Sequence, residues 1–360
     1  MKKTRTKEEA QEKSLMKSRM IDVARRAGVS KSTVSQYISG RYDYMSAETR
    51  ERIRQAIDDL GFVPNALARS LKKKRTFTIA IIVSNILNPF STMSTRGAED
   101  CCNKYGFDLI LCNADETPWK ERGYIETLVA KQVDGLIIST TEQNNDLLHA
   151  VNKRTPITIC DRNVPELGCD TVRVDNYAGI KLAVEHLVSL GHRRLALFVL
   201  PYQEVNRTPR RERAQAFRSL VGEFGLPHRP DWIVEIDRSE SRLAEAVAGL
   251  LSGPDAPTAI IGANDLMTIA LFTVIKKRLG LKIPSDVALL GFDDWEWAPL
   301  LEPPITVVAQ PAYEMGYMAA ELLIKRIREA QDYKPQYLVY QPELVARESC
   351  GEKACLTKPV

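Results

Sequence analysis

The 360-residue sequence lacks the patterns of several common protein classes. No apolar run approaches the roughly 18 to 20 residues that cross a bilayer, and the lysine-rich start has no apolar core of the signal-peptide type. The seven cysteines are odd in number and form no Cys-x-x-Cys pair, and the four histidines show no zinc-site spacing. We therefore expect a cytoplasmic protein with reduced, structural thiols and with neither a metal nor a cofactor.

The motifs of common enzymes are also missing. The chain has no GxGxxG or GxxxxGK[ST] phosphate loop, no nucleophile elbow and no acid/base pair with a convincing spacing. These absences argue against a sugar-converting enzyme, and we expect no catalytic residue. The missing signal peptide argues against a sugar-binding protein of the transport type.

Net charge is small but unevenly distributed. The 50 basic and 46 acidic residues leave only +4 overall. Residues 1–75 hold 19 basic and 9 acidic side chains, so this part carries +10 and the remainder −6. Such asymmetry predicts an N-terminal module that binds a polyanion, followed by a larger domain that need not.

Short apolar runs recur beyond residue 75 and alternate with amphipathic stretches of helical periodicity. The runs are Thr76–Val83, Leu109–Cys112, Gly135–Ser139, Ile157–Cys160, Leu195–Leu200, Ala259–Gly262 and Val287–Phe292. Near-continuous apolar runs are typical of parallel strands that are buried on both faces. This alternation predicts a doubly wound α/β architecture, long enough for two sheets with a ligand cleft at the carboxyl ends of their strands.

The segment from Ile21 to Gly40 has the pattern of a helix-turn-helix motif. Gly28 suits the left-handed turn after a first helix, and Ser30 is a good N-cap for a second. Val34 and Ile38 then face the core, while the polar residues of the second helix point outward. We expect a DNA-recognition helix that starts at Lys31, with an ordinary helical hairpin as the alternative.

At this point the chain resembles the lactose-repressor (LacI-type) family of bacterial transcription regulators, and the resemblance extends over nearly the whole sequence. The motifs that carry it are Asp22-Val-Ala-Arg-Arg-Ala-Gly-Val-Ser-Lys-Ser-Thr-Val-Ser, Ser46-Ala-Glu-Thr-Arg-Glu-Arg-Ile and Gly61-Phe-Val-Pro-Asn-Ala-Leu-Ala-Arg-Ser-Leu71. The resemblance implies an N-terminal three-helix head and a hinge helix, followed by a two-lobed domain like that of periplasmic binding proteins.

The family pattern also implies which residues contact DNA. The base-reading residues are Lys31, Ser32 and Gln36, and the backbone-contacting residues are Ser30, Thr33, Ser35 and Asn65. Gln36 stands where many members carry Arg, which predicts a different operator preference. Arg19 stands where the family usually has a Thr cap, and Ser18 is an alternative cap. For Tyr42 and Tyr44, in a slightly lengthened loop, backbone contact and packing both remain open.

The hinge, from Asn65 to Leu71, spans only about two helical turns. A helix this short is not stable alone in water, so we expect it to order only when paired with its twin on DNA. The family pattern assigns Ala68 and Leu71 to this DNA contact, with Leu71 as a wedge in the minor groove. An ordinary exposed leucine is the alternative.

The resemblance continues into the effector-binding part of the chain. By position in the family pattern, the effector residues are Phe90, Ser91, Asp161, Arg162, Arg207, Arg213, Arg238, Asn264, Asp293 and Gln310. Arg213 and Asp293 are the pair we expect most strongly. Trp295 and Trp297 follow the last apolar run. For these two side chains, stacking on a sugar and packing between the lobes remain alternatives.

Arginine is unusually frequent among the residues assigned to the cleft. Arginine forks bind carboxylates and phosphates in a bidentate manner, so an anionic effector is favoured over a neutral sugar. The alternative for Arg210 and Arg211 is a solvated helix start. The Gln-containing helix and the following Tyr-Asp-Tyr-Met-Ser also resemble regulators of ketogluconate-type sugar-acid catabolism, which points to 2-ketogluconate or 2-keto-3-deoxygluconate. Neutral sugars, sugar phosphates and nucleobases remain alternatives.

Together these features predict a DNA-binding transcription regulator, most simply a repressor released by its effector, with co-repression as the alternative. We expect a homodimer on a palindromic operator, because two recognition helices must reach two half-sites. The expected divisions are a basic disordered arm (1–17), a helix-turn-helix domain (18–63), a hinge and linker (64–76), a two-lobed effector-binding and dimerisation domain (77–346) and a C-terminal tail (347–360).

Overall fold

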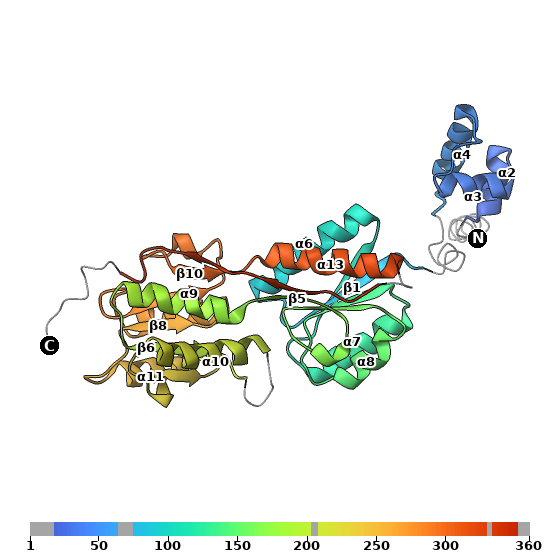
Figure 1. The fold of residues 1–360 in the computed structure, drawn as a ribbon. Coiled ribbons are helices and arrows are strands. Elements are labelled where there is room, and N and C mark those ends of the chain that lie inside the picture. The colour runs from blue at the N-terminus through green and yellow to red at the C-terminus, as the bar shows by residue number, and fades with distance from the viewer. Residues whose placement is uncertain (1–17, 64–74, 203–207, 330–332, 352–360) are drawn as a thin grey trace, which may run out of the picture. The chain divides into compact units, whose positions relative to one another are not determined.

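The computed structural model describes residues 18–63, 75–202, 208–329 and 333–351. These residues form two separate compact units, which divide between Thr76 and Phe77. The smaller unit is an all-helical head, and the larger contains two parallel-rich sheets with helices around them (Figure 1). The expected fold class, a helix-turn-helix head before a two-sheet α/β domain, is confirmed.

The head contains three helices, α2 (Met20–Ala27), α3 (Lys31–Ile38) and α4 (Ala47–Leu60). Gly28 ends α2 with φ of 65°, the left-handed conformation that glycine adopts without strain. Ser30 and Ser46 cap the next two helices, since each side chain accepts a bond from the amide three residues on. The start of α3 at Lys31 is therefore confirmed.

The cap of α2 differs from the alternative expected from the sequence. Arg19 occupies the N-cap position, and its backbone amide donates to the Asp22 carboxylate at 2.9 Å. The Ser18 hydroxyl donates instead to the Leu60 carbonyl oxygen at 2.7 Å, which ties the start of α2 to the end of α4. Ser18 as the replacement cap was therefore wrong, because α2 starts at Met20 and Arg19 holds the N-cap position, while the Ser18 hydroxyl acts as a donor to the third helix.

The larger unit consists of two six-stranded sheets with matching strand orders, β11-β5-β4-β3-β1-β2 and β12-β10-β9-β8-β6-β7. The first sheet contains β1 (Thr78–Val83), β2 (Asp108–Asn113), β3 (Gly135–Ile138), β4 (Ile157–Cys160), β5 (Asp170–Val174) and β11 (Tyr337–Tyr340). The second contains β6 (Leu195–Val199), β7 (Ile233–Glu235), β8 (Ala259–Gly262), β9 (Ala288–Phe292), β10 (Thr306–Ala309) and β12 (Glu343–Val345). Only β12 runs antiparallel to its neighbour.

Helices connect these strands and complete two lobes, which we call lobe 1 and lobe 2 after the first and second sheets. Those of lobe 1 are α6 (Pro89–Tyr105), α7 (Pro118–Ala130), α8 (Asn145–Asn152) and α13 (Ala312–Arg328). Those of lobe 2 are α9 (Asn176–Ser189), α10 (Thr208–Glu223), α11 (Glu240–Leu251), α12 (Asp265–Thr273) and the π-helical turn Val274–Arg278. Three short 3₁₀ turns complete the set, at Pro165–Leu167, Pro230–Trp232 and Ala298–Leu300.

All seven apolar runs named from the sequence form strands, within a residue or two of their expected ends. The strands that the sequence did not indicate are short or polar. β5 reads Asp-Thr-Val-Arg-Val and is nevertheless fully buried, and β11 alternates between exposed and half-buried residues. A search of the sequence for continuous apolar runs finds neither the short strands nor the polar ones.

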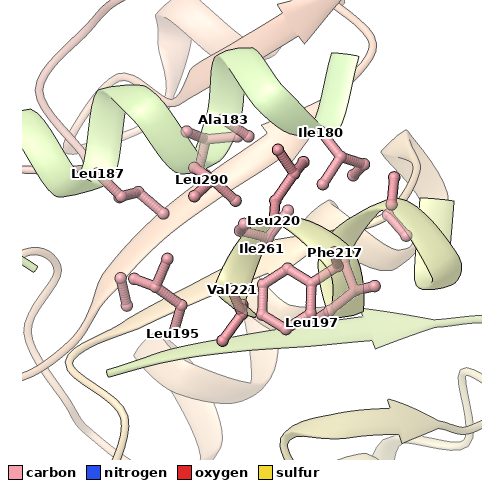
Figure 2. Close-up of a cluster of buried hydrophobic side chains, with 14 of the residues drawn as sticks. Ile180, Ala183, Leu187, Leu195, Leu197, Phe217, Leu220, Val221, Ile261 and Leu290 are labelled. Carbon is pink, nitrogen blue, oxygen red and sulfur yellow. The ribbon is translucent and has the colours of Figure 1, made fainter. Parts of the chain in front are cut away.

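The core of lobe 2 shows how helices cover the sheet (Figure 2). Ile180, Ala183 and Leu187 project from α9, while Phe217, Leu220 and Val221 project from α10 toward the same space. Strand side chains complete the same cluster, Leu195 and Leu197 from β6, Ile261 from β8 and Leu290 from β9. This packing fixes α10 on a rigid support, and the first turn of α10 contacts Glu116 and Glu142 of lobe 1; we call this boundary between the lobes the cleft.

The chain crosses between the lobes three times, after β5, after β10 and after β11. As a result α13 returns to lobe 1 and packs along α6 (Figure 1). Residues Arg347 to Cys350, which the sequence analysis placed in a tail, instead pack into lobe 2. Ser349 and Cys350 are buried, and the Ser349 hydroxyl accepts the Thr306 amide at 2.9 Å.

Among the described helices, none combines the length and apolar character that a bilayer crossing needs. Within the same residues no cluster of three or more His, Cys, Asp or Glu side chains is arranged to hold a metal ion. Five of the six described cysteines are buried and none is disulfide-bonded. Burial raises the pKa of Cys101, Cys102, Cys169 and Cys350 to about 12, which keeps these thiols protonated.

Candidate DNA-reading helix and effector cleft

The polar face of α3 lies on the surface of the head. Lys31, Ser32 and Gln36 are exposed, whereas Val34 is fully buried between the helices. The Ser30 hydroxyl accepts the Thr33 amide at 3.1 Å and so fixes the start of the helix. The arrangement presents three exposed polar side chains from a capped helix, an arrangement compatible with insertion into a major groove.

The remaining DNA-contact candidates divide into three groups. Thr33 and Ser35 are half-buried on the flank of α3. Tyr42 packs against the Tyr37 ring at 5.8 Å between centroids and lies under the Arg50 guanidinium, whereas Tyr44 is 99% exposed. Packing thus accounts for Tyr42 but not for Tyr44. The hinge candidates Asn65, Ala68 and Leu71 lie outside the described residues.

Arg213 is the centre of a bonded network at the cleft. It projects from the first turns of α10 and is 4% exposed. Its guanidinium donates to the Ala263 carbonyl oxygen at 2.6 Å, to Asn176 Oδ1 at 2.8 Å and to Gln310 Oε1 at 3.2 Å. It also lies 3.7 Å from the centre of the Phe292 ring. Burial lowers its pKa, and the charges of Asp293 and Asp161 oppose that shift.

Two carboxyl groups from neighbouring strand ends lie beside Arg213. Asp293 follows β9 and accepts a hydrogen bond from the Gln310 amide. Asp265 begins α12 after β8, and its backbone amide donates to Asp293 Oδ2 at 3.4 Å. Both are at least 94% buried. Burial, with the second carboxylate nearby, raises the pKa of Asp265 to about 8, and burial also raises that of Asp293.

Asp161 and Asp293 occupy equivalent places in the two lobes. They follow β4 and β9, which hold the same position in the two strand orders. Both residues have left-handed backbones, with φ of 72° and 75°. Such conformations are uncommon outside glycine. In both lobes the residue with this backbone lies directly at the carboxyl end of a parallel strand. The charge of Asp161 also contributes to the raised pKa of Asp293.

Arg162 is a buried arginine of lobe 1. Its side chain is 6% exposed, and its Nε lies 3.5 Å from Asp161 Oδ2. That Nε finds no hydrogen-bond partner among the described residues, and the same is true of Asp265 Oδ1 in lobe 2. Because a buried polar group without a partner is costly, these two atoms mark positions where a bound ligand would be stabilised.

The other expected cleft residues differ in their surroundings. Phe90 is buried in the apolar core of lobe 1, and Ser91 is buried in the first turn of α6. The Asn264 side chain caps α12 by accepting the Met267 amide at 3.0 Å, so its oxygen is already engaged. Arg238 is exposed and interacts electrostatically with Asp265. Arg207 lies outside the described residues.

Arg210 does not form a solvated helix start. Its side chain is 17% exposed, forms an ion pair with Glu116 of lobe 1, and donates to the Pro201 carbonyl oxygen at 3.0 Å. Burial and the nearby Arg162 lower its pKa to about 9. The solvated alternative is therefore wrong for Arg210, because a carboxylate of the opposite lobe reaches it.

Both parts of this structure are similar to known proteins. Residues 19–65 match the family model described as bacterial regulatory proteins, lacI family, and residues 184–350 match the periplasmic binding protein-like domain. The chain is 38% identical over 338 residues to "Probable HTH-type transcriptional regulator EndR" of Paenibacillus polymyxa, covering 93% of this chain and 98% of that protein. The chain belongs to the LacI family of bacterial regulatory proteins. It is therefore a DNA-binding transcription regulator and not an enzyme.

Other LacI-family proteins extend the comparison. The transcriptional regulator KdgR of Bacillus subtilis (strain 168) is 37% identical over 332 residues, with 91% of this chain and 96% of that one covered. The structure of a transcriptional regulator CelR–cellobiose complex is 30% identical, with a TM-score of 0.67 over 92% of this chain and all of that one. A lac repressor dimer bound to operator and anti-inducer ONPF shares the fold, at 24% identity, with a TM-score of 0.81 over 93% of this chain and 99% of that one.

Several cleft residues were not expected from the sequence of this LacI-family protein. They are Glu116, Glu142, Asn176, Asp265 and, behind the cleft, Arg173 with Glu212. Asp265 follows an apolar run and a helix-capping Asn, so its place at a strand end could have been inferred. The other five meet their partners only through long-range folding, and no local pattern marks them.

Proposed function

We propose that this LacI-family regulator binds its operator through α3, with Lys31, Ser32 and Gln36 toward base edges and Ser30, Thr33 and Ser35 toward the backbone. The exposure of the first three and the engaged hydroxyls of Ser30 and Thr33 support this division. The chain would act in the cytoplasm as a homodimer on a palindromic operator, because one head reads only one half-site.

The effector is an anionic sugar, with a sugar acid such as 2-ketogluconate or 2-keto-3-deoxygluconate as the leading candidate. The observation that carries this proposal is Arg162, a 95% buried residue at the carboxyl edge of lobe 1 that is ion-paired with Asp161 but whose Nε has no hydrogen-bond partner among the described residues. A ligand carboxylate supplies the acceptor that Arg162 lacks. Across the cleft, Asp265 and Asp293 are suited to sugar hydroxyls, and Gln310 links Asp293 to Arg213 by hydrogen bonds.

The proposed contacts are narrower than the full set expected from the sequence. Asp161, Arg162, Arg213, Asp293 and Gln310 interact with one another across the cleft by hydrogen bonds or charge. We retain them as effector contacts and add Asp265. Phe90 and Ser91 support the cleft from the core of lobe 1, and Asn264 from the cap of α12.

The test is thermal unfolding with a panel of ligands that contains 2-ketogluconate, 2-keto-3-deoxygluconate, sugar phosphates, cellobiose, ribose and a nucleobase. A ligand at 100 times its dissociation constant stabilises a protein by about 2.7 kcal/mol, which is readily measured. We expect stabilisation by sugar acids alone, and its loss in Arg162→Ala. Arg242→Ala is the matched control, because its side chain is 65% exposed and ion-paired with Asp237.

Stabilisation by cellobiose or ribose alone would overturn the anionic effector and leave the family assignment intact. The CelR complex with cellobiose makes the neutral sugar the serious competitor. A second measurement fixes the sign of regulation. The ligand that stabilises the protein is added to the protein on a selected operator duplex, and release indicates induction, whereas tighter binding indicates co-repression.

A further inference from the structure

The first turn of α10 is held by two carboxylates from the opposite lobe. The Glu142 carboxylate accepts the Thr208 amide at 2.8 Å and also the Thr208 hydroxyl. Two residues along, Arg210 forms its ion pair with Glu116. Both acidic residues follow strands of lobe 1, and both partners begin a helix of lobe 2. The two contacts therefore close the cleft from lobe to lobe.

The Glu142 carboxylate occupies a position that favours negative charge. It lies at the amino end of a 16-residue helix, where unpaired amides and the helix dipole favour negative charge. Its backbone has φ of 64°, a strained conformation for this residue that aims the side chain across the cleft. Its carboxylate also interacts electrostatically with Arg162 and Arg211.

Arg162 provides a second, independent indication that this position suits a ligand. Its charge influences the pKa values of Glu142, Arg210 and Arg213, two of which belong to the first turns of α10. It is 95% buried, and its Nε has no hydrogen-bond partner among the described residues. A ligand carboxylate in the place of the Glu142 carboxylate would meet the helix amides and the Arg162 guanidinium, which is ion-paired with Asp161 but has no hydrogen bond at its Nε among the described residues.

We propose that Glu142 is an internal competitor for the effector's anionic group and thereby sets the specificity of the cleft. In the ligand-free protein its carboxylate takes the Thr208 amide and neutralises the Arg162 and Arg211 charges. An anionic effector replaces that carboxylate and accepts from the same donors. Glu116 holds Arg210 in the same way, but outside this exchange. The inference rests on the proposed anionic effector and adds the residue that competes with its anionic group.

The competition changes the preference of the cleft for anionic over neutral ligands, because a neutral sugar has no charge with which to replace the Glu142 carboxylate. A neutral sugar therefore binds with Glu142 still in place, whereas a ligand carboxylate must displace Glu142, so the Glu142 charge lowers the affinity for the anion alone. Removing the Glu142 charge also weakens closure of the cleft, which lowers the affinity for every ligand. This second effect is common to all ligands, so it cancels in the ratio of two dissociation constants.

The experiment compares 2-ketogluconate with fructose, which carries a hydroxymethyl group in place of the carboxylate on the same skeleton. Both dissociation constants are measured by calorimetry on the full chain, for wild type, Glu142→Gln and Glu116→Gln. We expect Glu142→Gln to raise the preference for 2-ketogluconate over fructose by about fivefold or more, the effect of one charge-assisted hydrogen bond. Glu116→Gln should change the preference by less than about twofold.

Glu126→Gln is the matched control, because this carboxylate is 57% exposed and paired with Arg122 on α7. If wild type binds 2-ketogluconate and Glu142→Gln leaves the ratio unchanged, the competition is wrong and the anionic effector stands. If neither protein binds 2-ketogluconate but both bind fructose, the proposed effector fails, and the competition with it. Melting curves of the variants confirm that each one is folded.

Discussion

At the scale of single residues, buried carboxyl groups govern how the cleft responds to pH. Asp265 is 1% exposed, and its Oδ1 has no hydrogen-bond partner among the described residues. Its pKa of about 8 exceeds the ordinary value near 3.9, since burial and Asp293 disfavour the charged form. The folded protein therefore keeps a proton on Asp265 at pH values where the unfolded chain has released it.

This difference predicts the direction of a stability change. Between about pH 4 and pH 8 the folded state binds more protons than the unfolded state, so stability falls as pH rises through that window. Asp265→Asn removes this contribution because its amide does not titrate. We expect the melting temperature of wild type to fall between pH 5 and pH 8 by at least about 2 °C more than that of the variant.

The measurement is thermal unfolding of both proteins at matched ionic strength. A parallel pH dependence of the two melting temperatures would show that Asp265 titrates normally. Asp146→Asn, on the lobe 1 helix α8 and away from the cleft, serves as the control for removal of a carboxylate.

At the scale of elements, the contact between α6 and α13 depends on two glycines. A Cβ atom on Gly316 would lie 1.8 Å from the Ser94 carbonyl oxygen, and one on Gly97 would lie 2.0 Å from that of Tyr313. Both obstacles are backbone atoms within packed helices, so a side chain forces the helices apart. The start of α6 lies at the cleft, and α13 begins just after the second crossover, so this contact joins two elements that must keep their places.

We expect Gly316→Ala to destabilise the larger unit by about 1 to 3 kcal/mol or more, as overpacking of a tight core does. Gly123→Ala is the control on α7, where no atom lies within 4 Å of the added Cβ. Alanine favours a helix over glycine by about 0.8 to 1.0 kcal/mol, so this change should be neutral or stabilising. Urea unfolding checks both variants, and equal midpoints would contradict the close contact.

At the scale of the whole effector-binding unit, one chain of hydrogen bonds connects the cleft to the far edge of lobe 1. Arg213 donates to Asn176, which donates to Glu212 at 2.7 Å. Glu212 pairs with Arg173 on β5, and Arg173 donates to the Tyr337 hydroxyl on β11 at 3.0 Å. Arg173 belongs to lobe 1 and Glu212 to lobe 2. We therefore expect a movement of Arg213 in lobe 2 to displace Arg173 in lobe 1.

We predict that Glu212→Gln uncouples effector binding from operator binding. Coupling of this kind amounts to about 1 to 3 kcal/mol, a 5- to 150-fold change in operator affinity. The variant should lose most of that change while its effector affinity falls less. The measurement is operator affinity with and without the sugar that stabilises wild type.

Glu223→Gln supplies the matched control, because Glu223 ends the same helix and accepts only the exposed Tyr177 and Ser219 hydroxyls. An undiminished operator response in Glu212→Gln would show that the lobes communicate by another route. An equal loss in both variants would indicate a general effect of altering α10.

The sequence by itself determined the elements that depend on neighbours along the chain. Gly28, Ser30 and Ser46 place the limits of the head helices, because caps and left-handed turns act within four residues. The apolar runs located the central strands, since burial on both faces leaves a continuous apolar pattern. Family resemblance added Arg213 and Asp293, which the structure places in electrostatic contact.

Only the tertiary structure decided how charge is arranged across the cleft. Nothing near Glu142 in the sequence predicts its bond to Thr208, and nothing near Arg173 predicts its pair with Glu212. The sheets also decided that the polar strand β5 is buried and that α13 returns to pack in lobe 1. Such contacts link residues far apart in the chain, and their energy depends on distance and burial, which exist only once both lobes have folded.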